Sequence, residues 1–292
     1  MKLLLVLAIC VSEKLKNAKD KQDITPKDVV LYGFGRIGRL LARELMTRTG
    51  QGSLMRLRAI VTRGAIDQTV LEKRASLLKY DSVHGDFPGT VIVDAKNSAL
   101  IINGTTVHII SAKGPEDIDY TSYGIQDALI IDNTGAFRDK EELSRHLIPN
   151  GASKVLLTAP GAGIPNIVHG VNHTQNNPDD TDIFSAASCT TNAITPILKA
   201  IEDSFGVVQG HLETIHAYTN DQNLVDNMHK KYRRGRAAAR LEQSTLNAKR
   251  TTVEDFDHRV GERVSVLGRH KDWPAAATSR RSRHLICAPF HV

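Results

Sequence analysis

The stretch Asp28-Val-Val-Leu-Tyr-Gly-Phe-Gly-Arg-Ile-Gly38 decides the fold of this chain. Its first five residues predict a buried strand, and a Gly-x-Gly-x-x-Gly spacing follows at once. A helical pattern then continues to about Met46, and Leu57–Thr62 predicts the next strand. A strand, a glycine loop, a helix and a second strand within about 35 residues have the size of a βαβ dinucleotide-binding unit. A βα turn that binds no ligand is the alternative.

Each glycine has a physical role in such a loop. Gly33 permits the tight turn, Gly35 lets the backbone approach a pyrophosphate, and Gly38 allows close packing of helix and strand. The phosphates would lie at the N-terminus of the helix, where unpaired N–H groups and the helix dipole favour an anion. The expected cofactor-binding residues of the loop are Gly33, Phe34, Gly35, Arg36, Ile37 and Gly38.

The identity of the cofactor depends on the end of the second strand. An acidic residue about 20 positions after the loop would hold the ribose 2′-hydroxyl of NAD, but Met55–Ile66 contains no Asp or Glu. The strand ends at Thr62-Arg63-Gly64 instead. Arg63 is interpreted either as a partner for the 2′-phosphate of NADP or as a solvated surface arginine. The expected cofactor is therefore NAD or NADP.

Further strands follow along the chain. Ala128–Asp132 and Lys154–Thr158 predict buried strands, and ligands bind where such strands end in open α/β sheets. Asn103-Gly104 predicts a hairpin turn between strands at Val91–Val93 and Thr106–Ile110. The residues expected to line the cofactor cleft are Thr134, Gly135 and Thr158.

A candidate nucleophile lies in Ser185-Ala-Ala-Ser-Cys-Thr-Thr-Asn192. An apolar helical pattern follows, so Cys189 should lie at a helix N-terminus, where the dipole favours a thiolate. His216 comes 27 residues later. A Cys with a separate His is the minimum constellation for covalent catalysis through sulfur. A small buried core cysteine is the alternative.

The composition is that of a globular protein, and the length suits two domains or one large one. The chain has 292 residues, of which 41% are hydrophobic and 24% charged. Its three cysteines form no disulfide framework, which favours a reducing, cytoplasmic location. Residues 240–292 hold ten Lys/Arg against six Asp/Glu, so most of the net charge of +6 belongs to the tail. Nucleic-acid binding is therefore not expected of the body, and the histidines show no metal-ligand spacing.

The N-terminal stretch resembles a short signal peptide or a lipoprotein leader. Its apolar run, Leu3–Cys10, is too short to span a membrane, and charged residues follow it without a small-residue cleavage site. We interpret residues 1–27 as a helical leader and expect no membrane partner.

Three motifs together resemble the glyceraldehyde-3-phosphate dehydrogenase family. They are Gly33–Arg39, Ala187-Ser-Cys-Thr-Thr-Asn192 and His216-Ala-Tyr-Thr-Asn-Asp-Gln222, and the resemblance covers about residues 28–239. The leader resembles the extension of a longer bacterial branch. The resemblance implies an NAD(P)-dependent phosphorylating oxidoreductase of glycolysis, a phosphorylated aldehyde and inorganic phosphate as substrates, and a homotetramer.

The resemblance also implies the roles of individual residues. Cys189 would be the nucleophile and His216 its base. Thr158 and the Thr134-Gly135 turn would lie beside the nicotinamide. The residues implied to bind the phosphates of the substrates are Ser188, Thr190, Thr219 and Arg234.

The expected fold is α/β, with a Rossmann-type doubly wound dinucleotide-binding domain at 28–187 and an incomplete α+β catalytic domain at 188–239. Residues 240–292 depart from the family pattern and show no sustained periodicity, so a frame shift or truncation and a disordered basic tail are expected. Activity could then be impaired. The alternatives are an erythrose-4-phosphate dehydrogenase, a semialdehyde or acyl-phosphate reductase, and a non-catalytic nucleotide-binding fragment.

Overall fold

The computed structural model describes residues 25–48, 54–215, 223–228, 235–237 and 261–268 of the chain. They fall into two compact units, divided between Ser188 and Cys189, which we call unit 1 (N-terminal) and unit 2 (C-terminal). The leader interpreted at 1–27 lies almost entirely outside the described residues. Among the helices that are described, none has the length and apolar character that crossing a bilayer requires.

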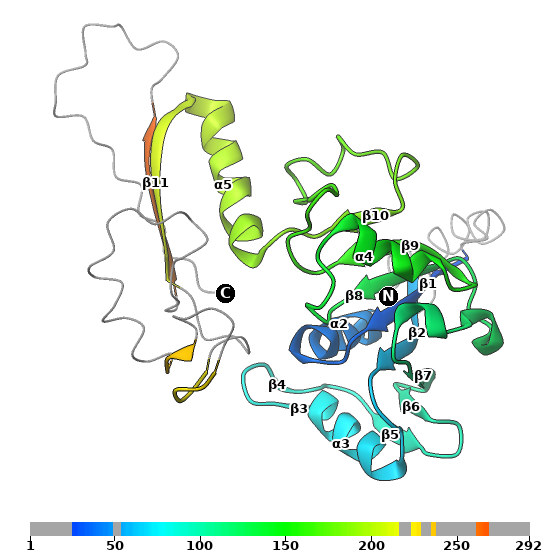
Figure 1. Ribbon diagram of the computed structural model, residues 1–292. Coiled ribbons are helices and arrows are strands. Elements are labelled where there is room, and N and C mark those ends of the chain that lie inside the picture. The colour runs from blue at the N-terminus through cyan, green and yellow to red at the C-terminus, as the bar shows by residue number, and fades with distance from the viewer. Residues whose placement is uncertain (1–24, 49–53, 216–222, 229–234, 238–260, 269–292) are drawn as a thin grey trace, which may run out of the picture. The chain divides into compact units, whose positions relative to one another are not determined.

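Unit 1 is built on one mixed sheet (Figure 1). The strand order is β10-β9-β8-β1-β2-β7-β6-β5, and the first six of these strands run parallel to one another. From β1 the chain adds strands outward in both directions, which is the doubly wound arrangement predicted from the sequence and confirms the α/β class. The parallel strands are β1 (Lys27–Tyr32), β2 (Met55–Thr62), β7 (Thr105–Ser111), β8 (Ala128–Asp132), β9 (Ala152–Leu157) and β10 (Ile183–Ser185).

An antiparallel extension forms one edge of the sheet. It consists of β5 (Val91–Asp94) and β6 (Ala99–Ile102), and β6 pairs with β7 around the turn at Asn103 and Gly104. Both turn residues have positive φ, 50° and 80°, as an Asn-Gly hairpin requires. The hairpin was predicted at the right turn but with the wrong partner strand, because Val91–Val93 is one strand further out.

The central strands are buried on both faces. Along β1, Val29 and Leu31 pack into one hydrophobic cluster and Val30 and Tyr32 into the other. Such strands are continuous apolar runs rather than alternating ones, which is why the sequence pattern identified them. The first cluster is covered by α2 (Arg36–Thr47) and α3 (Gln68–Lys79), and the second by α4 (Lys140–Ser144) and the short helices η1 (Pro115–Asp117), η2 (Tyr120–Tyr123) and η3 (Arg145–Leu147).

At two of the three loop glycines, the conformation of the backbone or a close backbone contact requires a residue without a side chain. Gly33 has a φ of +104°, a conformation that favours glycine. A Cβ on Gly38 would lie 2.3 Å from the carbonyl oxygen of Gly33, so α2 can approach β1 only where this side chain is missing. Gly35 differs, because a Cβ there would have no atom within 4 Å.

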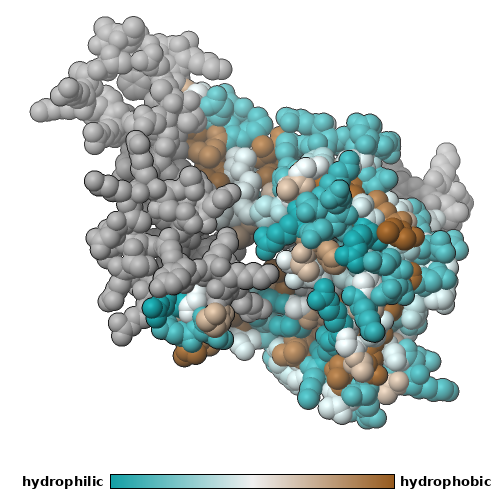
Figure 2. Space-filling model, viewed as in Figure 1, coloured by the Kyte–Doolittle hydropathy of each residue, from teal (hydrophilic) through white to brown (hydrophobic). Residues whose placement is uncertain are grey.

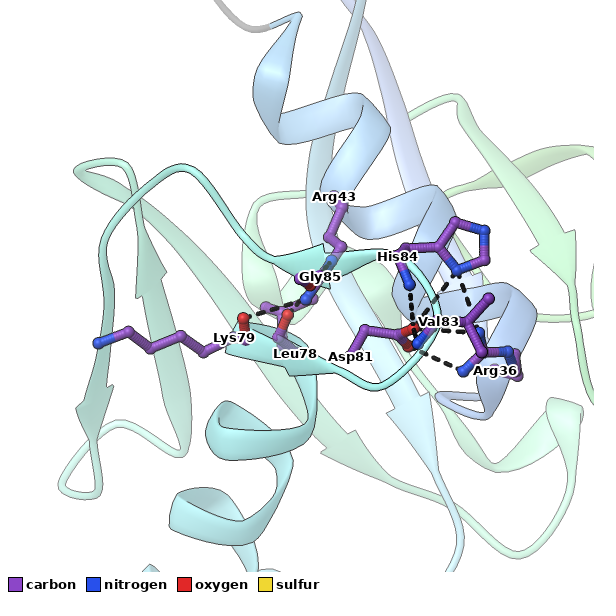
Figure 3. A network of polar contacts seen from close by, with 8 residues as sticks. All are labelled: Arg36, Arg43, Leu78, Lys79, Asp81, Val83, His84 and Gly85. Atoms are coloured by element: carbon purple, nitrogen blue, oxygen red, sulfur yellow. Dashed lines mark hydrogen bonds and ion pairs between the residues drawn. The ribbon is translucent and has the colours of Figure 1, made fainter.

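Two arginines of α2 hold a small hairpin formed by β3 (Tyr80–Asp81) and β4 (Gly85–Asp86) (Figure 3). The guanidinium of Arg36 donates two hydrogen bonds to Asp81, at 2.8 and 3.0 Å, and the side chain of Asp81 is only 4% exposed. Arg43 is buried and donates to three carbonyl oxygens, those of Leu78, Lys79 and Gly85. The hairpin is therefore attached to the helix that follows the glycine loop.

Unit 2 contains α5 (Cys189–Phe205), which contacts the antiparallel pair β11 (Val207–Ile215) and β12 (Gly261–Gly268). Strand β12 lies in the segment 240–292 that was expected to be disordered, so that expectation is wrong for these eight residues. Its sequence Arg263-Val-Ser-Val266 does alternate with a period of two over a short distance.

We expect Gly38→Ala to lower the free energy of unfolding by roughly 1–3 kcal/mol, because its Cβ would overlap a backbone oxygen that cannot move aside cheaply. Gly35→Ala is the matched control, since its position is open and its φ of −79° suits alanine. Urea denaturation of the three proteins measures the difference. Equal losses in the two variants would contradict the packing argument.

We expect Asp81→Asn to lower the free energy of unfolding by about 1–3 kcal/mol at pH 7. Hydrogen bonds from the backbone N–H groups of His84 and Val83 and from the guanidinium of Arg36 hold the pKa of the Asp81 carboxyl well below its usual range. A carboxyl group whose pKa is lower in the folded state than in the unfolded state stabilises the fold. This stabilisation is present above the unfolded-state pKa of about 4 and is lost as the pH falls below it.

The difference between wild type and Asp81→Asn should therefore narrow as urea denaturation is repeated from pH 7 down to about pH 3. Asp86→Asn, an exposed change in the same hairpin, is the control and should have little effect at any of these pH values. A constant difference across the pH range would mean that the carboxylate charge of Asp81 contributes nothing.

Candidate active site

The glycine loop joins β1 to α2 and leaves the N-terminus of α2 accessible. Gly35 is the N-cap, no side chain caps the helix there, and its first turn has no acidic residue. Open space above Gly35 and the positive end of the helix dipole fit the pyrophosphate of a dinucleotide. Ile37 is 48% exposed beside this space.

Two predicted loop residues use their side chains for the fold. Phe34 is only 7% exposed and packs in the cluster beneath α2, so its backbone alone is left for a ligand. The guanidinium of Arg36 is bound to Asp81 and also lies 3.0 Å from Nδ1 of His84. The Asp81 contact was not predicted, because 45 residues separate the partners.

The strand-end residues come together around one buried carboxylate. Asp132, at the end of β8, accepts hydrogen bonds through Oδ1 from the backbone N–H and the hydroxyl of Thr134, both at 2.8 Å. The main-chain oxygen of Asp132 accepts from the N–H and the hydroxyl of Thr158, at 3.1 and 2.9 Å. Gly135, with a φ of +70°, ends the turn in open space.

Asp132 and His146 were not among the residues predicted for the site. Nε2 of His146 lies 2.8 Å from Oδ2 of Asp132. Both side chains are 0% exposed. A polar residue that ends the apolar run Ala128–Ile131 was the available signal for Asp132. His146 had none, because its partner is known only once η3 is placed on the sheet.

Arg63 lies where β2 ends and is exposed. Burial raises the pKa of Tyr32, at the end of the neighbouring strand β1, and the positive charge of Arg63 acts in the opposite direction. The arginine therefore lies near the edge of the sheet where β1 enters the glycine loop. That is the edge on which a ribose 2′-phosphate would be recognised.

Cys189 is the first residue of α5 and is exposed, which confirms the helix start predicted for it. Ser188 and Thr190 on either side are partly exposed. The segment that leads to it is fixed by Ser185, whose hydroxyl accepts from the N–H of Ala187, and Ala187 has a φ of +58°. The remaining predicted partners lie outside the described residues: His216, Thr219 and Arg234.

Within the parts of the chain that the structure describes, no three His, Cys, Asp or Glu side chains come together in an arrangement that fits a metal ion. The geometry is therefore that of a loop for an anionic dinucleotide in unit 1 and of an exposed helix-starting thiol in unit 2.

Two domain models of one protein family match this chain. Residues 27–140 match the family model described as glyceraldehyde 3-phosphate dehydrogenase, NAD binding domain. Residues 188–249 match the model of the C-terminal domain of the same family, ten residues beyond the limit of 239 drawn from the motifs.

Individual relatives cover the same region. A glyceraldehyde-3-phosphate dehydrogenase-like protein of Pseudomonas aeruginosa is 58% identical over 212 residues, which are 72% of this chain and 46% of that protein. The glyceraldehyde-3-phosphate dehydrogenase of Thermotoga maritima is 41% identical over 212 residues, again 72% of this chain but 60% of that protein. The same aligned length is a smaller share of the Pseudomonas protein, which is therefore the longer of the two.

The chloroplastic glyceraldehyde-3-phosphate dehydrogenase A of Zea mays is 42% identical over 212 residues, 72% of this chain and 50% of that protein. The chain thus spans about half the length of the curated relatives it matches. Two domain models of one family, together with relatives at 41% to 58% identity, show that the chain belongs to the glyceraldehyde-3-phosphate dehydrogenase family.

Proposed function

We propose that this protein is an NAD(P)-dependent phosphorylating dehydrogenase that converts glyceraldehyde 3-phosphate to an acyl phosphate. The observation that carries the proposal is Cys189, exposed at the start of α5 in the motif Ser-Cys-Thr-Thr-Asn, within the residues that match the catalytic domain. An exposed thiol at a helix N-terminus has the environment that favours a nucleophilic thiolate.

The thiolate of Cys189, whose proton has passed to His216, attacks the aldehyde carbon and forms a C–S bond as the carbonyl π bond breaks. The protonated His216 returns the proton to the alkoxide, which gives a neutral thiohemiacetal. His216 takes the hydroxyl proton as hydride leaves the same carbon, and the backbone N–H of Cys189 stabilises the oxygen charge. The nicotinamide of bound NAD(P) supplies the hydride acceptor. Inorganic phosphate then displaces the thiolate from the resulting thioester, and the acyl phosphate is released.

The remaining residues bind and orient the reactants. The N-terminus of α2 above Gly35 holds the pyrophosphate, and the turn at Thr134 and Gly135 together with Thr158 forms the adjoining edge of the cofactor site. The substrate phosphates are bound by Ser188, Thr190, Thr219 and Arg234.

Two alternatives remain distinguishable by experiment. Erythrose 4-phosphate presents the same aldehyde and phosphate groups, so the same residues serve an erythrose-4-phosphate dehydrogenase. A non-catalytic nucleotide-binding protein needs only the loop of unit 1. We further propose a cytoplasmic location, from the three cysteines without a disulfide framework, and a homotetramer, from the family.

We expect the full chain to reduce NAD or NADP, measured as absorbance at 340 nm, with glyceraldehyde 3-phosphate and phosphate present. Cys189→Ser should abolish this turnover, because an alcohol at that place is a far weaker nucleophile. Cys287→Ser, a cysteine outside the proposed site, is the matched control. Turnover that survives in Cys189→Ser would contradict the mechanism, and faster turnover of erythrose 4-phosphate would favour the first alternative.

We expect Arg63→Ala to weaken the binding of NADP about tenfold or more and that of NAD less than about threefold, because only NADP offers a 2′-phosphate to the guanidinium. Calorimetric titration of both cofactors measures the two dissociation constants. Arg58→Ala is the control, since Arg58 lies in β2, the strand that ends just before Arg63, but donates to the carbonyl oxygens of Tyr123 and Gly124. Equal weakening of both cofactors by Arg63→Ala would assign it no part in their discrimination.

A further inference from the structure

A fully buried histidine lies behind the cofactor edge of the sheet. Nε2 of His146, in η3, is 2.8 Å from Oδ2 of Asp132, and neither side chain is exposed. Asp132 already accepts two hydrogen bonds through Oδ1, as a carboxylate does. Taken as a carboxylate, Asp132 can only accept, so we assign the proton of the contact between the two side chains to Nε2 of His146.

Two aromatic rings also pack against His146. Its ring makes edge contacts with Tyr32 and Phe137, at centroid distances of 4.6 and 5.2 Å. Nδ1 is buried and has no hydrogen-bond partner among the described residues. An apolar ring would fill this space without leaving a nitrogen unpaired, so what the histidine adds is its one hydrogen bond to Asp132.

The turn after β8 links that hydrogen bond to the glycine loop. Asp132 fixes Thr134 by accepting from its N–H and its hydroxyl. Thr134 in turn packs against Gly33, where a Cβ would lie 3.0 Å from Cγ2 and 3.1 Å from N of the threonine. Asn133 donates its N–H to the carbonyl oxygen of Tyr32, so the turn also holds the end of β1.

We propose that His146 is a positioning residue of the cofactor site: it orients the Asp132 carboxylate, which fixes the turn Asn133–Gly135 against the first glycine of the loop. The inference rests on the proposed binding of NAD(P) at that loop. His146 itself touches neither cofactor nor substrate, and it acts only through Asp132 and Thr134.

The test replaces His146 in two ways in the full chain. His146→Phe keeps a ring but removes the donor, whereas the amide nitrogen of His146→Gln can take the place of Nε2. Two readouts are taken: amide hydrogen exchange at Thr134 by NMR without cofactor, and the dissociation constant for NAD by calorimetry. Val107→Ala, a buried change in β7, is the control for loss of stability alone.

We expect faster exchange at Thr134 and about tenfold weaker NAD binding in His146→Phe, with both values restored to within about threefold in His146→Gln. If His146→Phe does not fold, Asp132→Asn carries the same expectation, because a neutral amide oxygen is a weaker acceptor than a carboxylate. Unchanged exchange at Thr134 would overturn the proposal, as would equal weakening of NAD binding in Val107→Ala.

The experiment can contradict the proposed function and the proposed role of His146 separately. A wild-type chain that binds no NAD overturns the proposed function at this loop, and with it the link from His146 to the cofactor. Exchange at Thr134 still decides whether His146 fixes the turn.

Discussion

The close approach of α2 to the end of β1 is the constraint on which the rest of unit 1 depends. It exists because Gly38 brings no side chain to the carbonyl oxygen of Gly33. On its other side, Gly33 lies against the turn at Asn133 and Thr134. The first residue of the loop is thus held between helix and turn, and the helix N-terminus has a fixed direction before any anion arrives.

Most of this architecture was predictable because it depends on local signals. Buried parallel strands are continuous apolar runs, and the glycine spacing marks where a strand passes into a helix. The hairpin partner was assigned wrongly because Ala99–Ile102 is a short apolar run with no period of its own. Strand β12 was missed because its alternation of polar and apolar residues lasts only from Arg263 to Val266.

The types of residue in the candidate site were predictable from the sequence, but the contacts between their side chains were not. The motif predicted that Arg36 matters, yet the side chain holds Asp81, and the loop offers a ligand mainly backbone groups. No spacing in the sequence marked His146, and the structure places it in the interior beside Asp132. Contacts of this kind join elements far apart in the chain, and a pattern within one element carries no information about them.

On the face of unit 1 shown in Figure 2, hydrophobic residues form separated spots among hydrophilic ones. In the hairpin that α2 holds, Tyr80 and Val83 are 53% and 74% exposed. The hydrogen bonds that Arg43 donates here all go to main-chain oxygens, which every residue type provides. The hairpin can therefore accept new side chains at exposed positions without losing that anchor, which makes it a suitable place to graft a label or a recognition epitope.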